Sequence, residues 1–160
     1  LDVRSLCLIR ETLARYDALA DFSFAMQGLG SGAISLYGNS EQKRNILEEV
    51  SAGRMIAGFA LSEPDAGSDV AAMNSKAFST TEGWKVNGEK SWISNGGIAD
   101  YYTFFAKTSD QSGSGGISAF LLKADNPGLS IAERQEVMAP HPLARLQLKD
   151  AELSPEALLG

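Results

Sequence analysis

The chain has little cysteine and little histidine, with one of each in 160 residues. A single cysteine excludes a disulfide within the chain and is typical of a reducing compartment, so we expect a cytoplasmic protein. Cys7 lies in the apolar run Leu6–Ile9, which predicts a buried helix residue and not a reactive thiol. His141 stands alone between two prolines, and a histidine without a placed partner is more often structural than catalytic.

Basic residues and long apolar runs are also scarce. The chain carries 14 Lys and Arg against 20 Asp and Glu, a net charge of −6. A nucleic-acid-binding surface needs a basic stripe, so nucleic acid is not an expected partner. No apolar run approaches the length of a membrane span and no signal peptide is visible, so we expect no membrane association. We also expect no metal site.

What is present is enough apolar sequence for a core. The apolar fraction is 44%, and 160 residues fit one domain of ordinary size or one domain with an appendage. The chain starts abruptly in a helix-like pattern, from which we expect a fragment or a truncation.

Residues 1–53 show the spacing of helices. Apolar residues recur every three or four positions, which predicts a partial helical N-terminal region. Asn39 with Gln42 three residues later matches a capping box, and Gly53 stands where that helix would end. Gly28, Gly30 and Gly32 weaken the preceding helix, and their small size is expected to let another helix pack closely.

Residues 54–160 show a different pattern, with short strand-like runs separated by turn residues. Asn87-Gly88 is the strongest hairpin signal, since a type I′ turn needs positive φ at both positions. Regular strands of this kind predict an antiparallel barrel or sandwich. The fold class is therefore α+β, with helices packed on one β-domain. The runs expected to be strands are Met55–Leu61, Asn74–Thr80, Trp84–Ser94, Tyr101–Thr108, Ile117–Ala124, Leu129–Val137 and Leu143–Leu153.

Two stretches carry the candidate chemistry. In Phe59–Asp69 an apolar run leads into a hydroxyl, a proline-braced turn and a Gly-Ser pair. Glycine lets a backbone approach a ligand closely, and successive turn N–H groups can form an anion site. The stretch alone is also ordinary turn chemistry. The second stretch, Lys90–Gly97, again puts a hydroxyl beside an aromatic residue at a strand end.

Together the two stretches resemble the acyl-CoA dehydrogenases, a family of flavoproteins. The resemblance rests on Ala60–Asp69 and Val86–Asn95, two long motifs at the family's separation. It covers nearly the whole chain in the family's order. The further matching blocks are Gly38–Lys43, Gly116–Phe120 and Ala124–Leu129.

The resemblance implies FAD as the cofactor. The strand-end hydroxyls of Ser62 and Ser94 would contact the flavin ring, where the family usually places threonine. Trp92 would lie against one side of the ring, although composition alone favours a core tryptophan there. The residues expected to complete the ring site with backbone groups and apolar surface are Phe59, Leu61 and Ile93.

The resemblance also implies a pyrophosphate contact from Gly67 and Ser68, and Ser68 would reach the phosphate end of the thioester substrate as well. Glu63, Asp65 and Asp69 could be taken for paired catalytic carboxylates. In the family this acidic loop is structural, so none of the three is expected to be a base.

The implied reaction is α,β-dehydrogenation of an acyl thioester, in which a base removes the α-proton and a hydride moves from the β-carbon to flavin N5. The family's base is a glutamate in a C-terminal helical domain, expected to begin near Leu159 and to be absent here. The chain alone is therefore expected to be inactive. Implied partners are an acyl-CoA or acyl-carrier-protein thioester and an electron-transfer flavoprotein, with a homo-oligomeric parent protein.

One departure from the family pattern concerns the substrate. Ala139–Arg145 replaces a Gly-Ile-Arg-Gly-Ser-like run, which suggests the hypothesis that the acyl group arrives on a carrier protein. Two other functions remain open. One is a flavin oxidase or monooxygenase of the same superfamily, and the other is a non-catalytic truncated interaction module.

Overall fold

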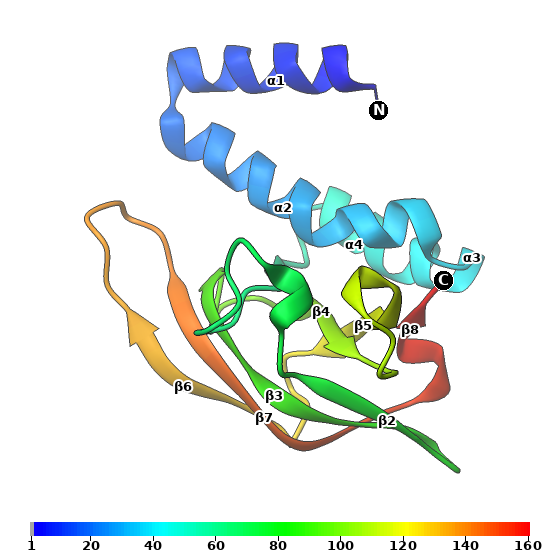
Figure 1. Cartoon of the computed structure of the whole chain (residues 1–160). Coiled ribbons are helices and arrows are strands. Elements are labelled where there is room, and N and C mark those ends of the chain that lie inside the picture. Colours follow the sequence, from blue (N-terminus) through cyan, green and yellow to red (C-terminus); the bar gives the residue numbers. More distant parts are fainter. Residues whose placement is uncertain (1) are drawn as a thin grey trace.

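The structure, a computed structural model, describes residues 2–160. Two long helices come first, followed by a short helical segment, and the rest of the chain is mainly strands (Figure 1). The helical elements are α1 (Val3–Tyr16), α2 (Ala18–Tyr37), α3 (Ser40–Gln42), a π-helical turn (Lys43–Leu47) and α4 (Glu48–Ser51). The strands are β1 (Ala57–Ala60), β2 (Lys76–Thr80), β3 (Gly83–Ser94), β4 (Tyr101–Lys107), β5 (Ile117–Lys123), β6 (Leu129–Gln135), β7 (Leu143–Leu153) and β8 (Leu158–Leu159).

The strands form one sheet in the order β6-β7-β3-β2-β4-β5-β8, and β1 pairs with β4. Most pairs are antiparallel, while β1 and β2 each run parallel to β4. The α+β class and the antiparallel sheet are confirmed, but the sheet does not close into a barrel. It curves beneath α2, and α1 lies on the side of α2 away from the sheet (Figure 1).

The prediction of a hairpin turn at Asn87-Gly88 is wrong. The strand β3 runs through both residues, and the turn from β2 to β3 lies at residues 81–82, between the paired Thr80 and Gly83. The register of β3 against β7 shifts at this point, because β7 carries an extra residue there. The Asn87 side chain accepts a 2.8 Å hydrogen bond from the backbone N–H of Asp150, which has a φ of 48°. Asn87 therefore binds the backbone of a bulge in the neighbouring strand and does not form a turn.

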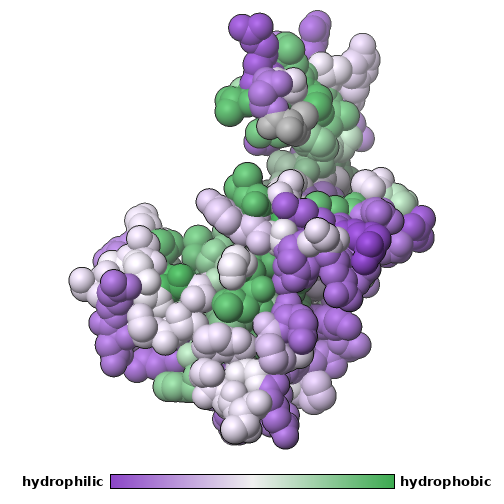
Figure 2. Space-filling model, turned by 90° about the vertical axis from the view of Figure 1, so that its right-hand side faces the viewer, coloured by the Kyte–Doolittle hydropathy of each residue, from purple (hydrophilic) through white to green (hydrophobic). Residues whose placement is uncertain are grey.

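Two apolar clusters hold the fold together. The larger lies within the curved sheet and includes the fully buried Phe104, Phe120 and Leu146. The smaller joins α2 to the sheet through Ile34 and Tyr101, both buried. On the face shown in Figure 2, apolar side chains gather between the helical part and the sheet, and hydrophilic side chains cover much of the remaining face.

The segment from α3 to α4 begins with the predicted capping box. The Asn39 side chain accepts from the backbone of Gln42, and the Gln42 side chain accepts from the backbone of Asn39. The other end of the Gln42 amide donates to the carbonyl of Leu158 at 3.0 Å. Gly53 has a φ of 71° just after the segment, as a C-terminal glycine requires. Gln42, the second residue of the capping box, thus also connects the helical segment to β8.

Of the three glycines of α2, Gly30 faces the sheet and not another helix, whereas a side chain at Gly28 or Gly32 would meet nothing within 4 Å among the described residues. A side chain at Gly30 would collide with Ala57 and Gly58 of β1, so glycine allows this close approach. The hydroxyl of Thr103 on β4 donates to the Gly30 carbonyl at 2.7 Å. The prediction of helix packing at this site is wrong, because the strand β1 occupies the space.

The helix α1 packs against α2 and has no buried residue. Cys7 is exposed, so the prediction of a buried cysteine is wrong. The apolar spacing identified the helix correctly, and Ile9 and Leu13 of that side are half-buried, but Cys7 stays exposed. Within residues 2–160, none of the helices is both long and apolar enough to span a membrane.

Candidate functional site

A pocket of about 280 Å³ lies between α2 and the ends of β1 and β3. It brings together six of the eight residues expected to form a cofactor site. The remaining lining comes from residues that the sequence did not indicate, in α2 and at the start of β1. The lining residues are Met26, Leu29, Ala57, Phe59, Leu61, Ser62, Trp92, Ile93 and Ser94.

The two serine-bearing strand ends lie side by side. The carbonyl of Ser62, just after β1, accepts a 2.9 Å hydrogen bond from the backbone N–H of Ser91 in β3. Strand β1 itself is fixed between α2 and β4, because it pairs in parallel with β4 and packs on Gly30. Two motifs that are distant in the sequence therefore bring Ser62 and Ser94 to one pocket.

Trp92 stands at an irregularity in β3. Its φ is 60°, which is unusual for a large residue, and the register of β3 against β7 shifts between Lys90 and Ile93. The backbone N–H of Trp92 donates to the Gln135 side chain at 2.9 Å. The indole is 60% exposed, so the alternative of a core tryptophan is wrong. Such backbone strain costs about 1–3 kcal/mol and is found preferentially at ligand sites.

His141 lies at the edge of the site, beside Ser94, although no role was expected for it there from the sequence. Its Nε2 lies 3.2 Å from the Ser94 hydroxyl, and its ring packs against Phe22 of α2 with 4.5 Å between centroids. The loop between β6 and β7 carries it, and this loop extends beyond the sheet toward α2 (orange in Figure 1). The flanking prolines, which restrict the backbone, were the only signal in the sequence that this ring is held in place.

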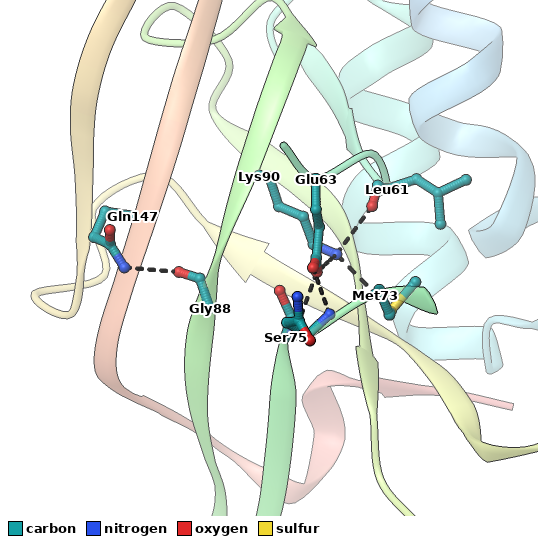
Figure 3. Close-up of polar contacts among 8 residues, drawn as sticks. Leu61, Glu63, Met73, Ser75, Gly88, Lys90 and Gln147 are labelled. Carbon is teal, nitrogen blue, oxygen red and sulfur yellow. Dashed lines mark hydrogen bonds and ion pairs between the residues drawn. The ribbon is translucent and has the colours of Figure 1, made fainter. Parts of the chain in front are cut away.

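Behind the pocket, Lys90 and Glu63 form a buried ion pair (Figure 3). Their charged atoms are 2.8 Å apart, and the two side chains are 0% and 3% exposed. The Lys90 ammonium also donates to the Leu61 carbonyl at 3.0 Å and lies 4.9 Å from the centre of the Phe104 ring. The pair therefore fixes the backbone that carries Leu61 and Ser62.

The surroundings set the charge state of the carboxylate. Burial would raise the pKa of Glu63, but hydrogen bonds from Lys90 and Ser75 outweigh it, so the pKa lies below its usual value. Burial lowers the pKa of Lys90, and the charge of Glu63 opposes that effect. Glu63 also accepts from the backbone N–H of Asn74. An ionised carboxylate with these partners, shielded from solvent, is a structural group and not an available base.

Gly67 and Ser68 are not part of the pocket lining. Both are exposed, in the turn that follows the short bridge between Glu63 and Ala66. Asp69 is exposed in the same turn, and Asp65 is exposed between the two bridged residues. A ligand in the pocket would have to extend beyond it to reach Ser68.

Residues 58–151 match the family model described as "Acyl-CoA dehydrogenase, middle domain". The chain belongs to the acyl-CoA dehydrogenase family. The probable acyl-CoA dehydrogenase fadE25 of Mycobacterium leprae is 39% identical over 130 residues, which are 81% of this chain and 33% of the relative. The chain thus spans about a third of the length of this curated relative.

Solved structures of similar proteins have the same fold. A chain in a structure described as the electron transferring flavoprotein of Acidaminococcus fermentans superposes with a TM-score of 0.92 at 34% identity, covering 100% of this chain and 43% of that one. A chain described as the FAD complex of PigA gives a TM-score of 0.91 at 31% identity, covering 97% of this chain and 42% of that one. The resemblance seen in the sequence is confirmed.

Proposed function

We propose that this chain is the flavin-facing segment of an FAD-dependent acyl-thioester dehydrogenase. One observation carries the proposal: the ends of β1 and β3 meet at one pocket, which offers the hydroxyls of Ser62 and Ser94 beside the exposed indole of Trp92. Residues 1–53 would be part of a helical domain and residues 54–160 the β-domain.

The pocket suits one end of FAD and not the whole molecule. Its volume of about 280 Å³ is at the lower limit of ligand pockets, which usually hold about 300–1,000 Å³. Its walls are apolar except for the two serines, as a flat ring system with one polar edge requires. The rest of the cofactor would lie outside the pocket, and we assign Gly67 and Ser68 to its pyrophosphate. Ser68 would also meet the phosphate end of the substrate.

When bound, FAD would supply the acceptor for the hydride that leaves the β-carbon of the acyl thioester. The chain's own residues would orient and stabilise it. Ser62 and Ser94 would donate hydrogen bonds to its polar edge, and preorganised donors act most strongly where negative charge develops. The indole of Trp92 would cover one face of the ring. Phe59, Leu61 and Ile93 would contribute the apolar wall.

The base that removes the α-proton is proposed to lie outside these 160 residues. Glu63 is the carboxylate nearest in sequence to Ser62, and it is buried in its pair with Lys90. The chain spans 33% of its M. leprae relative, so a base elsewhere in a longer protein is consistent with the family. The proposed substrate is an acyl-CoA or an acyl-carrier-protein thioester. An electron-transfer flavoprotein is the proposed electron acceptor, and the whole enzyme is proposed to be a homo-oligomer.

Tryptophan fluorescence tests the cofactor assignment directly. The chain has two tryptophans, and the second, Trp84, is partly buried against Phe120 with 5.3 Å between ring centroids. In Trp84→Phe, where only Trp92 emits, FAD should quench the emission in a saturable manner. In Trp92→Phe the remaining emission should change little, and ADP should quench neither variant.

We expect this binding to be weak, with a Kd of about 1 mM, or −4 kcal/mol, because contacts along much of the cofactor are missing. The purified chain should therefore be colourless. Equal quenching of both variants, or none at millimolar FAD, would contradict the assignment of the pocket. In the complete enzyme, an acyl-CoA should bleach the bound flavin without oxygen and yield the enoyl thioester.

A further inference from the structure

The position of His141 is defined by two parts of the fold. Its Nε2 lies 3.2 Å from Ser94 Oγ at the end of β3. The other contact is with Phe22 of α2, whose ring centroid is 4.5 Å away at an interplanar angle of 53°. The ring is therefore held between a helix and a strand end, at the edge of the pocket that Ser94 lines.

The loop that carries His141 is fastened to the same strand end. The carbonyl of Pro142 accepts a 2.9 Å hydrogen bond from the backbone N–H of Asn95, which is buried. The Asn95 side chain donates to the Ala57 carbonyl at the start of β1, at 2.8 Å. The backbone N–H of His141 donates to the carbonyl of Ala139 at 2.8 Å. The contact between His141 and Ser94 is thus built into the framework of the pocket.

The direction of this hydrogen bond decides what Ser94 can offer. A serine hydroxyl has one proton and two lone pairs, and a neutral imidazole carries its proton on one of two nitrogens. If Ser94 donates to Nε2, the hydroxyl presents only lone pairs to the pocket. If Nε2–H donates to Ser94 Oγ, the hydroxyl proton is free to point into the pocket.

We propose that His141 donates from Nε2 to the Ser94 hydroxyl and so positions its proton toward an acceptor atom in the pocket. His141 is then a positioning residue, because it acts on the ligand through Ser94. The proposal rests on the proposed function, which needs the Ser94 proton to point into the pocket and names a flavin as the ligand. The direction of the hydrogen bond is a property of the chain itself and can be measured without any ligand.

Nitrogen chemical shifts of the imidazole test the direction. The chain has one histidine, so its ring signals need no assignment by mutation. In ¹⁵N-labelled protein at about pH 8, where imidazoles are neutral, two-bond ¹H–¹⁵N spectra should show the proton on Nε2. Ser94→Ala should shift the Nε2 signal. The matched control Ser79→Ala, at an exposed serine of β2, should not. A proton on Nδ1, or spectra unchanged in Ser94→Ala, would overturn the proposal.

Flavin binding tests the consequence for the pocket. In the Trp84→Phe background, His141→Phe keeps a ring against Phe22 but loses the donor, and FAD should bind about 2- to 10-fold more weakly, as for one lost hydrogen bond. His141→Gln restores an N–H donor and should recover most of that affinity. Equal affinity in His141→Phe would overturn the positioning role. Expected imidazole spectra with no FAD binding in any variant would instead contradict the proposed function and support the direction of the hydrogen bond.

Discussion

The two sides of strand β3 differ in the burial and pairing of their side chains. On the side facing the interior, Lys90 is fully buried and makes its contacts with Glu63, Leu61 and the Phe104 ring. On the pocket side, Trp92 is 60% exposed with a strained backbone, and the Ser94 hydroxyl makes a hydrogen bond with His141.

The difference reflects what each side stabilises. The buried pair compensates its own desolvation through close hydrogen bonds and supports the backbone under the pocket. The pocket side retains strain and leaves a hydroxyl and an aromatic face for another molecule. Changes on the interior side should therefore reduce stability, whereas changes on the pocket side should reduce ligand chemistry and spare the fold.

The largest effect is expected from Lys90→Met. The change leaves an unpaired carboxylate at Glu63 in the interior, which typically costs about 3–5 kcal/mol. Urea denaturation should show this loss in the free energy of unfolding. The matched control Lys76→Met, at an exposed position of β2, should stay within about 0.5 kcal/mol of the parent.

A second substitution separates the pair from the packing around it. Adding Glu63→Leu to Lys90→Met removes the unpaired charge, and replacement of both partners by apolar groups is often close to neutral. The double variant should therefore recover much of the lost stability. If the double variant is as unstable as Lys90→Met, packing and not charge explains the loss.

On the pocket side, Ser94→Ala in the complete enzyme should slow flavin reduction by about 10²-fold, by analogy with the loss of an oxyanion-hole donor. The hydroxyl matters most as charge reaches the ring, so its loss falls on the transition state. Ser68→Ala should mainly raise apparent dissociation constants, since a phosphate contact is made equally in ground and transition states. Stopped-flow reduction at saturating substrate separates the two. A parental rate in Ser94→Ala would contradict its assignment to the flavin.

Much of this division could be predicted from the sequence, because the strand-end motifs are local. The family resemblance of the local motifs predicted that Ser62, Trp92 and Ser94 share one site, and the structure brings all three to one pocket. The capping box at Asn39 follows from residue order alone. The placement of Asn87 could not be predicted, because it depends on a bulge at Asp150 in a strand that is distant in the sequence.

Three other features depend on partners that lie far away in the chain. Lys90 appears in a mixed polar and apolar run, and only the fold shows that Glu63 is its counter-ion. His141 acquires a role because α2 and β3 meet at its loop. Cys7 is exposed although it lies in an apolar run of α1. Helical spacing predicts which residues share an apolar side, but not which of them another element covers.

A smaller effect should appear on lowering the pH. Because the pKa of Glu63 lies below its usual value of 4.5, its contribution to stability is complete above about pH 4.5. It is lost as the pH falls through the lower, folded-state pKa. A single group contributes at most about 1.4 kcal/mol per pH unit. Chemical denaturation between pH 7 and pH 3 should show a shallower decline for Glu63→Gln than for the parent. The control Glu82→Gln, exposed in the β2–β3 turn, should follow the parent curve, and equal slopes in all three proteins would contradict this account.

The smallest effect on stability is expected from Trp92→Gly. Glycine adopts a φ of 60° without the strain that tryptophan bears there. The relief of about 1–3 kcal/mol is partly cancelled by the greater freedom of glycine in the unfolded chain, about 0.5–1 kcal/mol. The indole is 60% exposed, so its removal gives up roughly 100 Å² of buried apolar area, or at most about 2.5 kcal/mol. These terms nearly cancel, so we expect the unfolding free energy to stay within about 1 kcal/mol of the parent while FAD quenching disappears. Trp84→Gly, on the same strand but packed against Phe120, should instead destabilise the fold. A clear destabilisation by Trp92→Gly would show that the pocket side of β3 supports the fold as the interior side does.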